Sequence, residues 1–323
     1  MGEPMNILRT PDEHFADLPD YPFEPNYVAV DSARTDAVRM HYVDAGPTDA
    51  PVVVLLHGQP TWSYLYRHVI AVLCEAGLRV IAPDNIGFGR SDKPADPTDY
   101  TFARHVDWMH SAFTRLDLRD VTLVVQDWGG PIGLSVLARD PDRIARVVTT
   151  NTILHTCEPD LAGKLSWPHH AVGDGQVVHQ ETLLDYVAFY QRAPKLLPSV
   201  FLDAVAGPLS HEVLAAYDAP FPDRAFTAGL RQLTALIPLT RNDPGAAIGR
   251  ATMAVLRNWQ RPFLTAYSDR DPPTRGWDKV FQSEVPGADG QPHTTVAGAG
   301  HFIQEQRGEE LGRIVADFVA RTA

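Results

Sequence analysis

Short apolar runs rich in β-branched residues alternate with longer amphipathic segments along most of the chain, and this alternation most limits the possible fold. An apolar run bounded by Gly or Pro predicts a buried strand, and apolar residues spaced three or four apart predict a helix. Strands that alternate with helices form a mostly parallel sheet covered by helices. The sequence therefore predicts an α/β fold with a mostly parallel eight-stranded sheet, whose first two strands form an antiparallel pair, over 27–30, 38–43, 52–56, 78–82, 121–125, 144–150, 262–267 and 293–296.

The interval 155–240 departs from this alternation. It carries helical patterns at 183–192, 212–217 and 226–236, but no convincing strand. We therefore expect a helical cap over 155–240, inserted into a core formed by 1–154 and 241–323. No low-complexity tract or flexible linker separates the two parts, so cap and core are expected to pack as one unit.

Composition excludes several classes of protein. The chain has 323 residues and a formal net charge of −12, which disfavours nucleic acid because such binding needs clustered basic residues. Cys74 and Cys157 form no CxxC pair, so neither a disulfide framework nor a structural zinc site is indicated. The first residues lack a secretory pattern, and the longest aliphatic stretch, 52–56, is too short to span a bilayer. We expect a soluble, cytoplasmic protein without membrane partners.

The strongest chemical motif is Gln126-Asp127-Trp128-Gly129, which directly follows the predicted strand 121–125. A strand, a sharp turn with small neighbours and a helix form a nucleophile elbow, which exposes the central side chain above the sheet. Here that side chain is the carboxylate of Asp127, and the chain has no G-x-S-x-G, which disfavours an ordinary serine esterase. The alternative is that Asp127 only caps a helix that starts near Pro131.

Two further segments fit a hydrolytic site. His57-Gly58 follows the strand 52–56, where a loop can supply one backbone NH of an oxyanion hole, so the expected donors are the NH groups of Gln59 and Trp128. His301 lies in a Gly-rich turn after the last strand, which gives the chain order nucleophile, acid, histidine. The acid is expected after the strand 262–267, where Asp269 and Asp271 compete.

Together these segments resemble the haloalkane dehalogenases of the α/β-hydrolase superfamily, in the branch with an Asp-His-Asp triad and paired Trp halide donors. The similarity spans nearly the whole chain, and its most specific segment is the Gln-Asp-Trp-Gly-Gly elbow. The segments that carry it are His57-Gly58-Gln59-Pro60-Thr61-Trp62-Ser63-Tyr64-Leu65-Tyr66-Arg67, Ala82-Pro83-Asp84, Gly87-Phe88-Gly89-Arg90-Ser91-Asp92-Lys93-Pro94, Val124-Val125-Gln126-Asp127-Trp128-Gly129-Gly130, Tyr217-Asp218-Ala219-Pro220-Phe221-Pro222 and Gly300-His301-Phe302.

The resemblance implies a complete reaction without a metal or organic cofactor. Asp127 would displace halide from a saturated carbon, and His301 would activate the water that hydrolyses the resulting alkyl ester. Among the two candidate acids the family pattern favours Asp271, because it places a Gly or Ser three residues before the acid and often a Pro after it. Asp269 would then be a turn residue. The expected partners are a small apolar organic substrate, water and the halide product, and the expected assembly is a monomer or homodimer.

Halide binding is where the chain departs from its relatives. Trp128 matches the first indole donor of the family, but the relatives carry a second Trp on the first cap helix, where this chain has Tyr186. Trp167 could replace that donor or could be a packing aromatic of the cap. Gln59 is also a departure, since the nearest relatives often have Glu there and other branches have Asn.

Two alternative functions remain. An epoxide hydrolase would use the same nucleophile together with cap tyrosines, for which Tyr186, Tyr190 and Tyr217 are available, but such enzymes usually resemble His-Asp-Trp-Gly at the elbow. The other alternative is a hydrolase-fold protein that only binds a ligand. His169, His170 and Asp174 lack a recognised metal pattern and are expected in a solvated cap loop.

Overall fold

Eight strands form one sheet in the computed structural model, which describes residues 5–31, 37–158, 166–173 and 176–322. β3 is antiparallel to both of its neighbours, and the pairs among the six strands from β12 to β5 are parallel, which confirms the predicted sheet and its opening antiparallel pair. In spatial order the strands are β12 (Thr294–Val296), β11 (Phe263–Ser268), β8 (Ile144–Thr150), β7 (Val121–Gln126), β4 (Val52–Leu56), β5 (Arg79–Pro83), β3 (Val38–Ala45) and β2 (Asn26–Val30).

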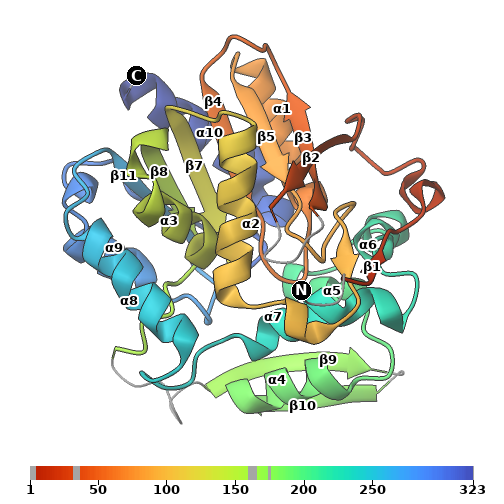
Figure 1. Cartoon of the computed structure of the whole chain (residues 1–323). Coiled ribbons are helices and arrows are strands. Elements are labelled where there is room, and N and C mark those ends of the chain that lie inside the picture. The colour runs from red at the N-terminus through yellow and green to blue at the C-terminus, as the bar shows by residue number, and fades with distance from the viewer. Residues whose placement is uncertain (1–4, 32–36, 159–165, 174–175, 323) are drawn as a thin grey trace.

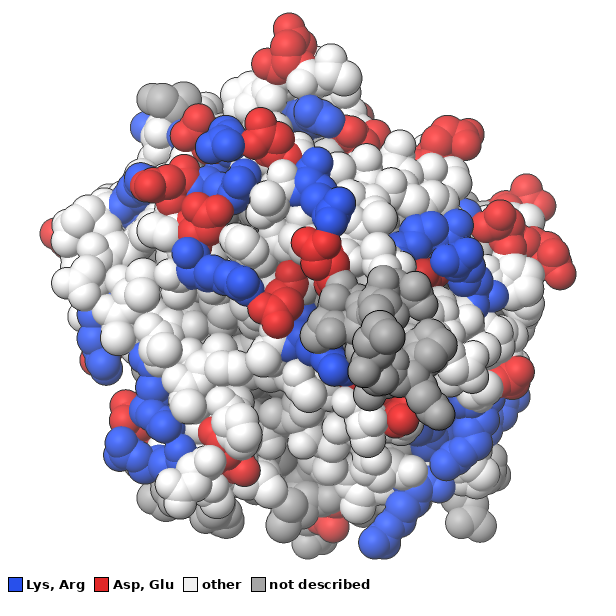
Figure 2. All heavy atoms as spheres, in the orientation of Figure 1, with Lys and Arg blue, Asp and Glu red and all other residues white. Residues whose placement is uncertain are grey.

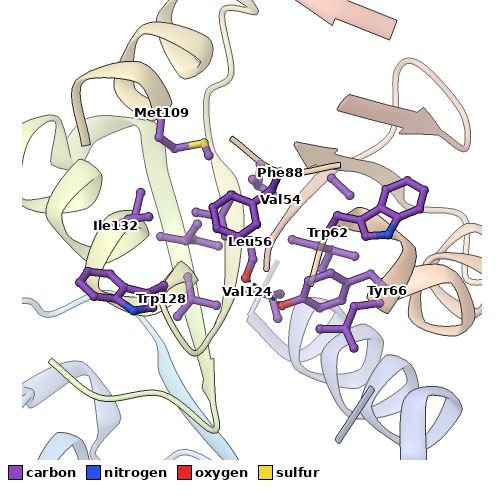
Figure 3. Packing of buried hydrophobic residues seen from close by; sticks show 14 of the residues in the cluster. Val54, Leu56, Trp62, Tyr66, Phe88, Met109, Val124, Trp128 and Ile132 are labelled. Atoms are coloured by element: carbon purple, nitrogen blue, oxygen red, sulfur yellow. Dashed lines mark hydrogen bonds between the residues drawn. The ribbon is translucent and has the colours of Figure 1, made fainter. Parts of the chain in front are cut away.

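The two central strands, β4 and β7, form the middle of the hydrophobic core. Residues 53–56 and 121–125 are almost fully buried, as expected for parallel strands covered on both faces. Figure 3 shows Trp128 and Ile132 on one side of these strands and Trp62 and Tyr66 on the other. The core therefore continues from the sheet into the segments that follow β4 and β7.

Helices cover both faces of the sheet (Figure 1). On one face α1 (Arg67–Glu75), which follows a 3-10 turn at Ser63–Tyr66, packs against α10 (Ile303–Thr322). On the other face α2 (Phe102–Arg115), α3 (Gly129–Arg139) and α8 (Pro244–Leu256) pack together, and α9 (Trp277–Glu284) lies against β11. The further short elements are β1 (Ile7–Leu8), which pairs with β6 (Lys93–Pro94), and 3-10 turns at Asp12–Phe15, Pro97–Asp99, Pro141–Arg143, Arg224–Thr227 and Pro286–Ala288.

Local sequence signals explain several helix ends. Gly77 has a φ of 76° just beyond α1, where a left-handed residue ends a helix at least cost. The Thr101 hydroxyl accepts a hydrogen bond from Arg104 N at 3.1 Å and caps α2. The C-terminal helix begins at Ile303, earlier than the predicted start near 309. The backbone of Arg307 is non-helical, and this kink separates a polar first turn from the rest of the helix. Only the rest of the helix has the amphipathic pattern from which a helix could be predicted.

The segment between β8 and α8 lies over the carboxyl ends of the strands (Figure 1). It contains α4 (Leu183–Arg192), α5 (Pro198–Ala206), α6 (His211–Asp218) and α7 (Ala228–Ala235). The expectation of no strand here is wrong, because β9 (Ser166–Gly173) and β10 (Gln176–Thr182) form an antiparallel hairpin. Its strands pair with each other rather than with the main sheet, and they lack the long aliphatic runs that marked the buried strands.

Several hydrogen bonds fasten this segment to the core. Trp62 Nε1 donates to Ala216 O at 3.1 Å, Thr10 Oγ1 donates to Pro220 O at 2.7 Å, and Gln59 Nε2 donates to Leu230 O at 2.7 Å. The hydroxyl of Tyr217 in α6 donates to Glu305 in α10. These bonds attach α6 and α7 directly to the loops around the strand ends.

Charged residues of both signs are interspersed on the face shown in Figure 2, without a continuous basic surface across it. This distribution agrees with the net charge of −12. None of the helices in the described ranges has the length and apolar character required to cross a membrane.

Candidate active site

Asp127 occupies a tight turn between β7 and α3. Its φ is 47°, a left-handed value that is uncommon for a residue with a side chain. The two glycines that follow permit the turn, because a Cβ on Gly129 would lie 2.1 Å from Leu56 O and one on Gly130 would lie 1.8 Å from Thr152 Oγ1. The turn thus brings the Asp127 carboxylate to the carboxyl end of the sheet.

The two oxygens of the Asp127 carboxylate have different partners. Oδ1 accepts a hydrogen bond from Gln59 N at 2.6 Å, and the backbone NH of Trp128 also binds the carboxylate. Oδ2 lies 3.4 Å from His301 Nε2. Burial raises the pKa of Asp127, but His301 and the two NH groups outweigh it and hold the pKa below its usual range. The group is therefore an ionised carboxylate at neutral pH.

His301 is held on its other side by Asp271. Nδ1 lies 3.1 Å from each carboxylate oxygen of Asp271, which is 3% exposed and also accepts a hydrogen bond from the Thr274 hydroxyl. Asp269 instead accepts a hydrogen bond from Gly298 N at 2.8 Å within the turn. Of the two candidate acids, the structure brings Asp271 to His301.

The two flanking carboxylates control the protonation of His301. Burial lowers its pKa, but Asp271 and Asp127 outweigh burial and raise the pKa to about 10. The ring is therefore protonated at neutral pH while Asp127 carries its charge.

Two residues hold the His301 loop that sequence reasoning did not assign to this role. Asn151, just after β8, donates through Nδ2 to Gly300 O at 2.7 Å and to His301 O at 3.0 Å. Gln126 Nε2 donates to His301 O at 3.3 Å. Both are polar residues at the carboxyl end of an apolar strand, which is the one sequence signal that could have indicated them.

A small cavity of ≈ 30 Å³ lies between the Asp127 carboxylate and the segment between β8 and α8. Gln59, Trp128 and Tyr186 line it together with Asp127 and His301. The remaining walls are mainly apolar and come from Phe201, Val205, Thr234, Ile237 and Pro273. An ionised carboxylate in an apolar, enclosed site suits attack on a small uncharged molecule.

The aromatic residues that were predicted to bind halide or substrate differ in whether they line the cavity. Trp128 is 3% exposed and packs against Phe102 and His155, with ring centroids 5.5 and 4.8 Å away. Tyr186 lies on the cavity wall, and the ring of Tyr190 packs on it at 4.7 Å. Tyr217 is hydrogen-bonded to Glu305 and is not among the cavity-lining residues.

Four residues named from the sequence fall outside this description. Trp167 belongs to β9, but its side chain lies outside the described part of the structure, as do those of His169 and His170. Asp174 lies outside the described residues altogether. Within the described ranges, no group of three or more His, Cys, Asp or Glu side chains is arranged to hold a metal ion.

Known proteins resemble this chain in sequence over nearly its whole length. A family model described as the alpha/beta hydrolase fold matches residues 51–218. A haloalkane dehalogenase of Psychrobacter cryohalolentis is 46% identical over 316 residues, which is 98% of each chain. A haloalkane dehalogenase of Mycolicibacterium paratuberculosis is 45% identical and covers 95% of this chain and 96% of its own length.

Solved structures give the same result. The haloalkane dehalogenase DpaA of Paraglaciecola agarilytica NO2, described as tetrameric, has a TM-score of 0.79 and 32% identity and covers 96% of this chain and 97% of its own. DatA of Agrobacterium tumefaciens C58 has a TM-score of 0.73 and 26% identity, over 97% of this chain and 100% of its own. All four proteins are named dehalogenases, so neither alternative function is favoured.

Proposed function

The chain belongs to the haloalkane dehalogenase family of the α/β-hydrolase fold and is a hydrolase of carbon–halogen bonds, and we propose that it works through an alkyl ester on Asp127. The observation that carries this proposal is the pair of contacts at that carboxylate. Oδ1 accepts a hydrogen bond from Gln59 N, and the backbone NH of Trp128 also binds the carboxylate. Oδ2 lies 3.4 Å from Nε2 of His301, which lines the same cavity as Asp127. We therefore assign Oδ2 as the attacking oxygen and Oδ1, which accepts from a backbone NH, as the oxygen that becomes the ester carbonyl.

In the first proposed step, Asp127 Oδ2 attacks the carbon that bears the halogen. A carbon–oxygen bond forms, the carbon–halogen bond breaks, and halide leaves with the bonding electron pair. A charged leaving group gains more from hydrogen-bond donors in an enclosed apolar site than in water. We assign the donor role to the Trp128 indole NH and the Tyr186 hydroxyl, because both residues line the cavity. Trp167 remains a sequence-level candidate for the second donor.

In the second step, a water attacks the ester carbonyl carbon of Asp127. His301 Nε2 takes a proton from this water, Asp271 stabilises the resulting imidazolium, and negative charge develops on Oδ1 between the NH groups of Gln59 and Trp128. The tetrahedral intermediate then collapses and the alcohol leaves with the proton from His301. The remaining hydroxyl proton of the Asp127 carboxyl group passes to His301, which restores the carboxylate and the protonated ring. The net reaction converts a haloalkane and water into an alcohol, a halide ion and a proton.

This order of steps explains why His301 is protonated in the resting site yet can act as a base. The Asp127 carboxylate is one of the two charges that raise its pKa to about 10. Alkylation removes that charge, so the pKa of His301 falls and the ring releases its proton to solvent, which is the proton of the net reaction. His301 is then neutral and can act as the general base.

Further proposals concern the substrate, the cap, the assembly and the location of the protein. A small cavity with apolar walls favours a small uncharged haloalkane. We further propose that residues 155–240 form an inserted cap, that the protein is a monomer or homodimer, and that it is located in the cytoplasm.

Halide release tests the proposed function. Purified protein should release bromide from 1,2-dibromoethane and 1-bromobutane, and Asp127→Ala should abolish this release. Exposed Asp289→Ala is the matched control, which should release bromide at the wild-type rate. Bromide release that persists in Asp127→Ala would contradict the assignment of the nucleophile. Diol formation from styrene oxide without bromide release would instead indicate an epoxide hydrolase.

A further inference from the structure

The peptide group between Gly58 and Gln59 is held from its carbonyl side. Gly58 O accepts hydrogen bonds from His57 Nδ1 at 2.9 Å, from Thr61 N at 3.1 Å and from Thr61 Oγ1 at 3.1 Å. In a trans peptide the oxygen and the NH point in opposite directions. Fixing this oxygen therefore directs Gln59 N–H away from it, towards Asp127 Oδ1 at 2.6 Å.

The hydrogen-bond partners of His57 determine its tautomer. Asn85 N lies 2.9 Å from His57 Nε2, and because a backbone NH can only donate, Nε2 is the acceptor. Burial lowers the pKa of the fully buried His57, so the ring is neutral and its single proton lies on Nδ1. Nδ1–H consequently donates to Gly58 O.

Asn85, which donates to His57, is next to a residue with several hydrogen bonds of its own. Asn85 follows Asp84, whose carboxylate is fully buried and accepts hydrogen bonds from Ser63 N at 2.7 Å and Arg90 N at 2.8 Å. His57, Asn85 and Asp127 follow β4, β5 and β7, which are neighbours in the sheet. One chain of contacts thus runs across three adjacent strand ends to the nucleophile.

The backbone of Gly58 lies directly beside the Asp127 carboxylate. A Cβ on Gly58 would lie 2.2 Å from Asp127 Oδ1, so the backbone itself occupies the space beside the nucleophile. The direction of the Gln59 N–H is therefore set by what binds Gly58 O from behind.

We propose that His57 is a positioning residue that orients the Gly58–Gln59 peptide as an oxyanion donor for hydrolysis of the ester on Asp127. This proposal rests on the proposed function. It also predicts which step depends on His57. Negative charge leaves Oδ1 when the ester forms and returns to it when water attacks, so a misaligned donor slows hydrolysis rather than alkylation.

The test separates these two steps by rapid mixing with 1-bromobutane. In His57→Leu we expect a bromide burst close to one per active site at the wild-type rate. Steady turnover should then be slower by about 10- to 100-fold, at most the effect of deleting one oxyanion donor. Mass spectrometry should find the Asp127 peptide butylated during turnover. His57→Asn keeps an NH donor near the position of Nδ1 and should recover part of the steady rate.

His293 provides the matched control. It also bridges a backbone NH and a carbonyl, Thr265 N at 3.1 Å and Ala288 O at 2.8 Å, but it lies near β12 and does not line the cavity. His293→Asn should keep the wild-type ratio of burst to steady rates. Should His57→Leu fail to fold by circular dichroism, Thr61→Val, which removes only a hydroxyl donor to Gly58 O, must show the same accumulation of ester.

Equal slowing of burst and steady rates, or no change in either, would overturn the role of His57. That outcome differs from a failure of the proposed function, in which the wild-type protein releases no bromide or Asp127→Ala continues to release it.

Discussion

His301 Nε2 lies 3.4 Å from Asp127 Oδ2, so the protonation of the proposed base is coupled to the charge of the proposed nucleophile. A catalytic site in which one group attacks and the other later accepts a proton needs such coupling, because the base must become available only after the attack.

Neutralising the nucleophile should lower the pKa of His301. Because the pKa of about 10 is raised above the usual value near 6.5, this group contributes stability that is complete below pH ~6.5 and is lost as the pH rises through about 10. In Asp127→Asn the pKa of His301 should be lower, and less stability should be lost as the pH rises. NMR titration of the His301 ring, with His293 as the reference signal, measures the shift. An unchanged titration of His301 would show that Asp127 does not control it.

Removing the Tyr186 hydroxyl should weaken halide binding. A hydrogen bond to a charged group contributes about 1.5–3 kcal/mol, so bromide affinity should fall about 10-fold or more in Tyr186→Phe, and Tyr186→Trp should retain a donor. Bromide titration followed by tryptophan fluorescence measures the affinity. Tyr100→Phe is the control, since the Tyr100 hydroxyl donates to Pro94 O at 2.8 Å and not into the cavity. Equal affinity in Tyr186→Phe would exclude Tyr186 as a donor.

The buried ion pair between Arg67 and Glu305 should be costly to break. Their side chains are 3% and 2% exposed, Arg67 NH2 lies 2.9 Å from Glu305 Oε2, and Tyr217 of the cap also donates to Glu305. Glu305→Gln leaves the guanidinium without its counter-charge, so the free energy of unfolding should fall by about 3–5 kcal/mol in urea titrations.

An exposed ion pair on the same helix provides the comparison. Arg313 NH2 lies 3.0 Å from Glu309 Oε2, and these side chains are 59% and 71% exposed. Glu309→Gln should change the free energy of unfolding by at most about 0.5 kcal/mol. Similar losses in both variants would mean that burial does not decide the strength of the Arg67–Glu305 pair.

Asp84 should make the fold sensitive to acid. Burial raises its pKa, but His41 at 2.7 Å and the backbone NH groups outweigh burial and lower the pKa to about 2. A lowered pKa contributes stability above the unfolded value near 4 that is lost as the pH falls through about 2, here about 2 kcal/mol. Asp84→Asn should remove this part of the acid dependence in urea titrations between pH 5 and 2, whereas exposed Asp289→Asn should keep it. A steep acid limb retained in Asp84→Asn would contradict the assignment.

Buried strands could be predicted from local sequence patterns more completely than the hairpin and the start of the last helix. The strand that ends at Leu56 was predicted at its full length because both its faces are buried, which makes its sequence continuously apolar. The hairpin β9–β10 was missed because its residues lack such a run and pair only with each other. The start of α10 was missed because its first turn is polar and precedes the kink at Arg307.

The sequence alone determined the alternation of strands and helices and the elbow around Asp127, because each depends on residues adjacent in the chain. It also determined the order of nucleophile, acid and histidine, because each of these residues follows its own locally recognisable strand. The family pattern already favoured Asp271 over Asp269, and only the tertiary structure gave the contact of Asp271 with His301 and of Asp269 with Gly298 N. The tertiary structure also placed Tyr186 on the cavity wall and Asn151 and His57 behind the catalytic groups. These relationships join residues from different strands and the cap, and a distance between such residues is fixed by packing rather than by any local pattern.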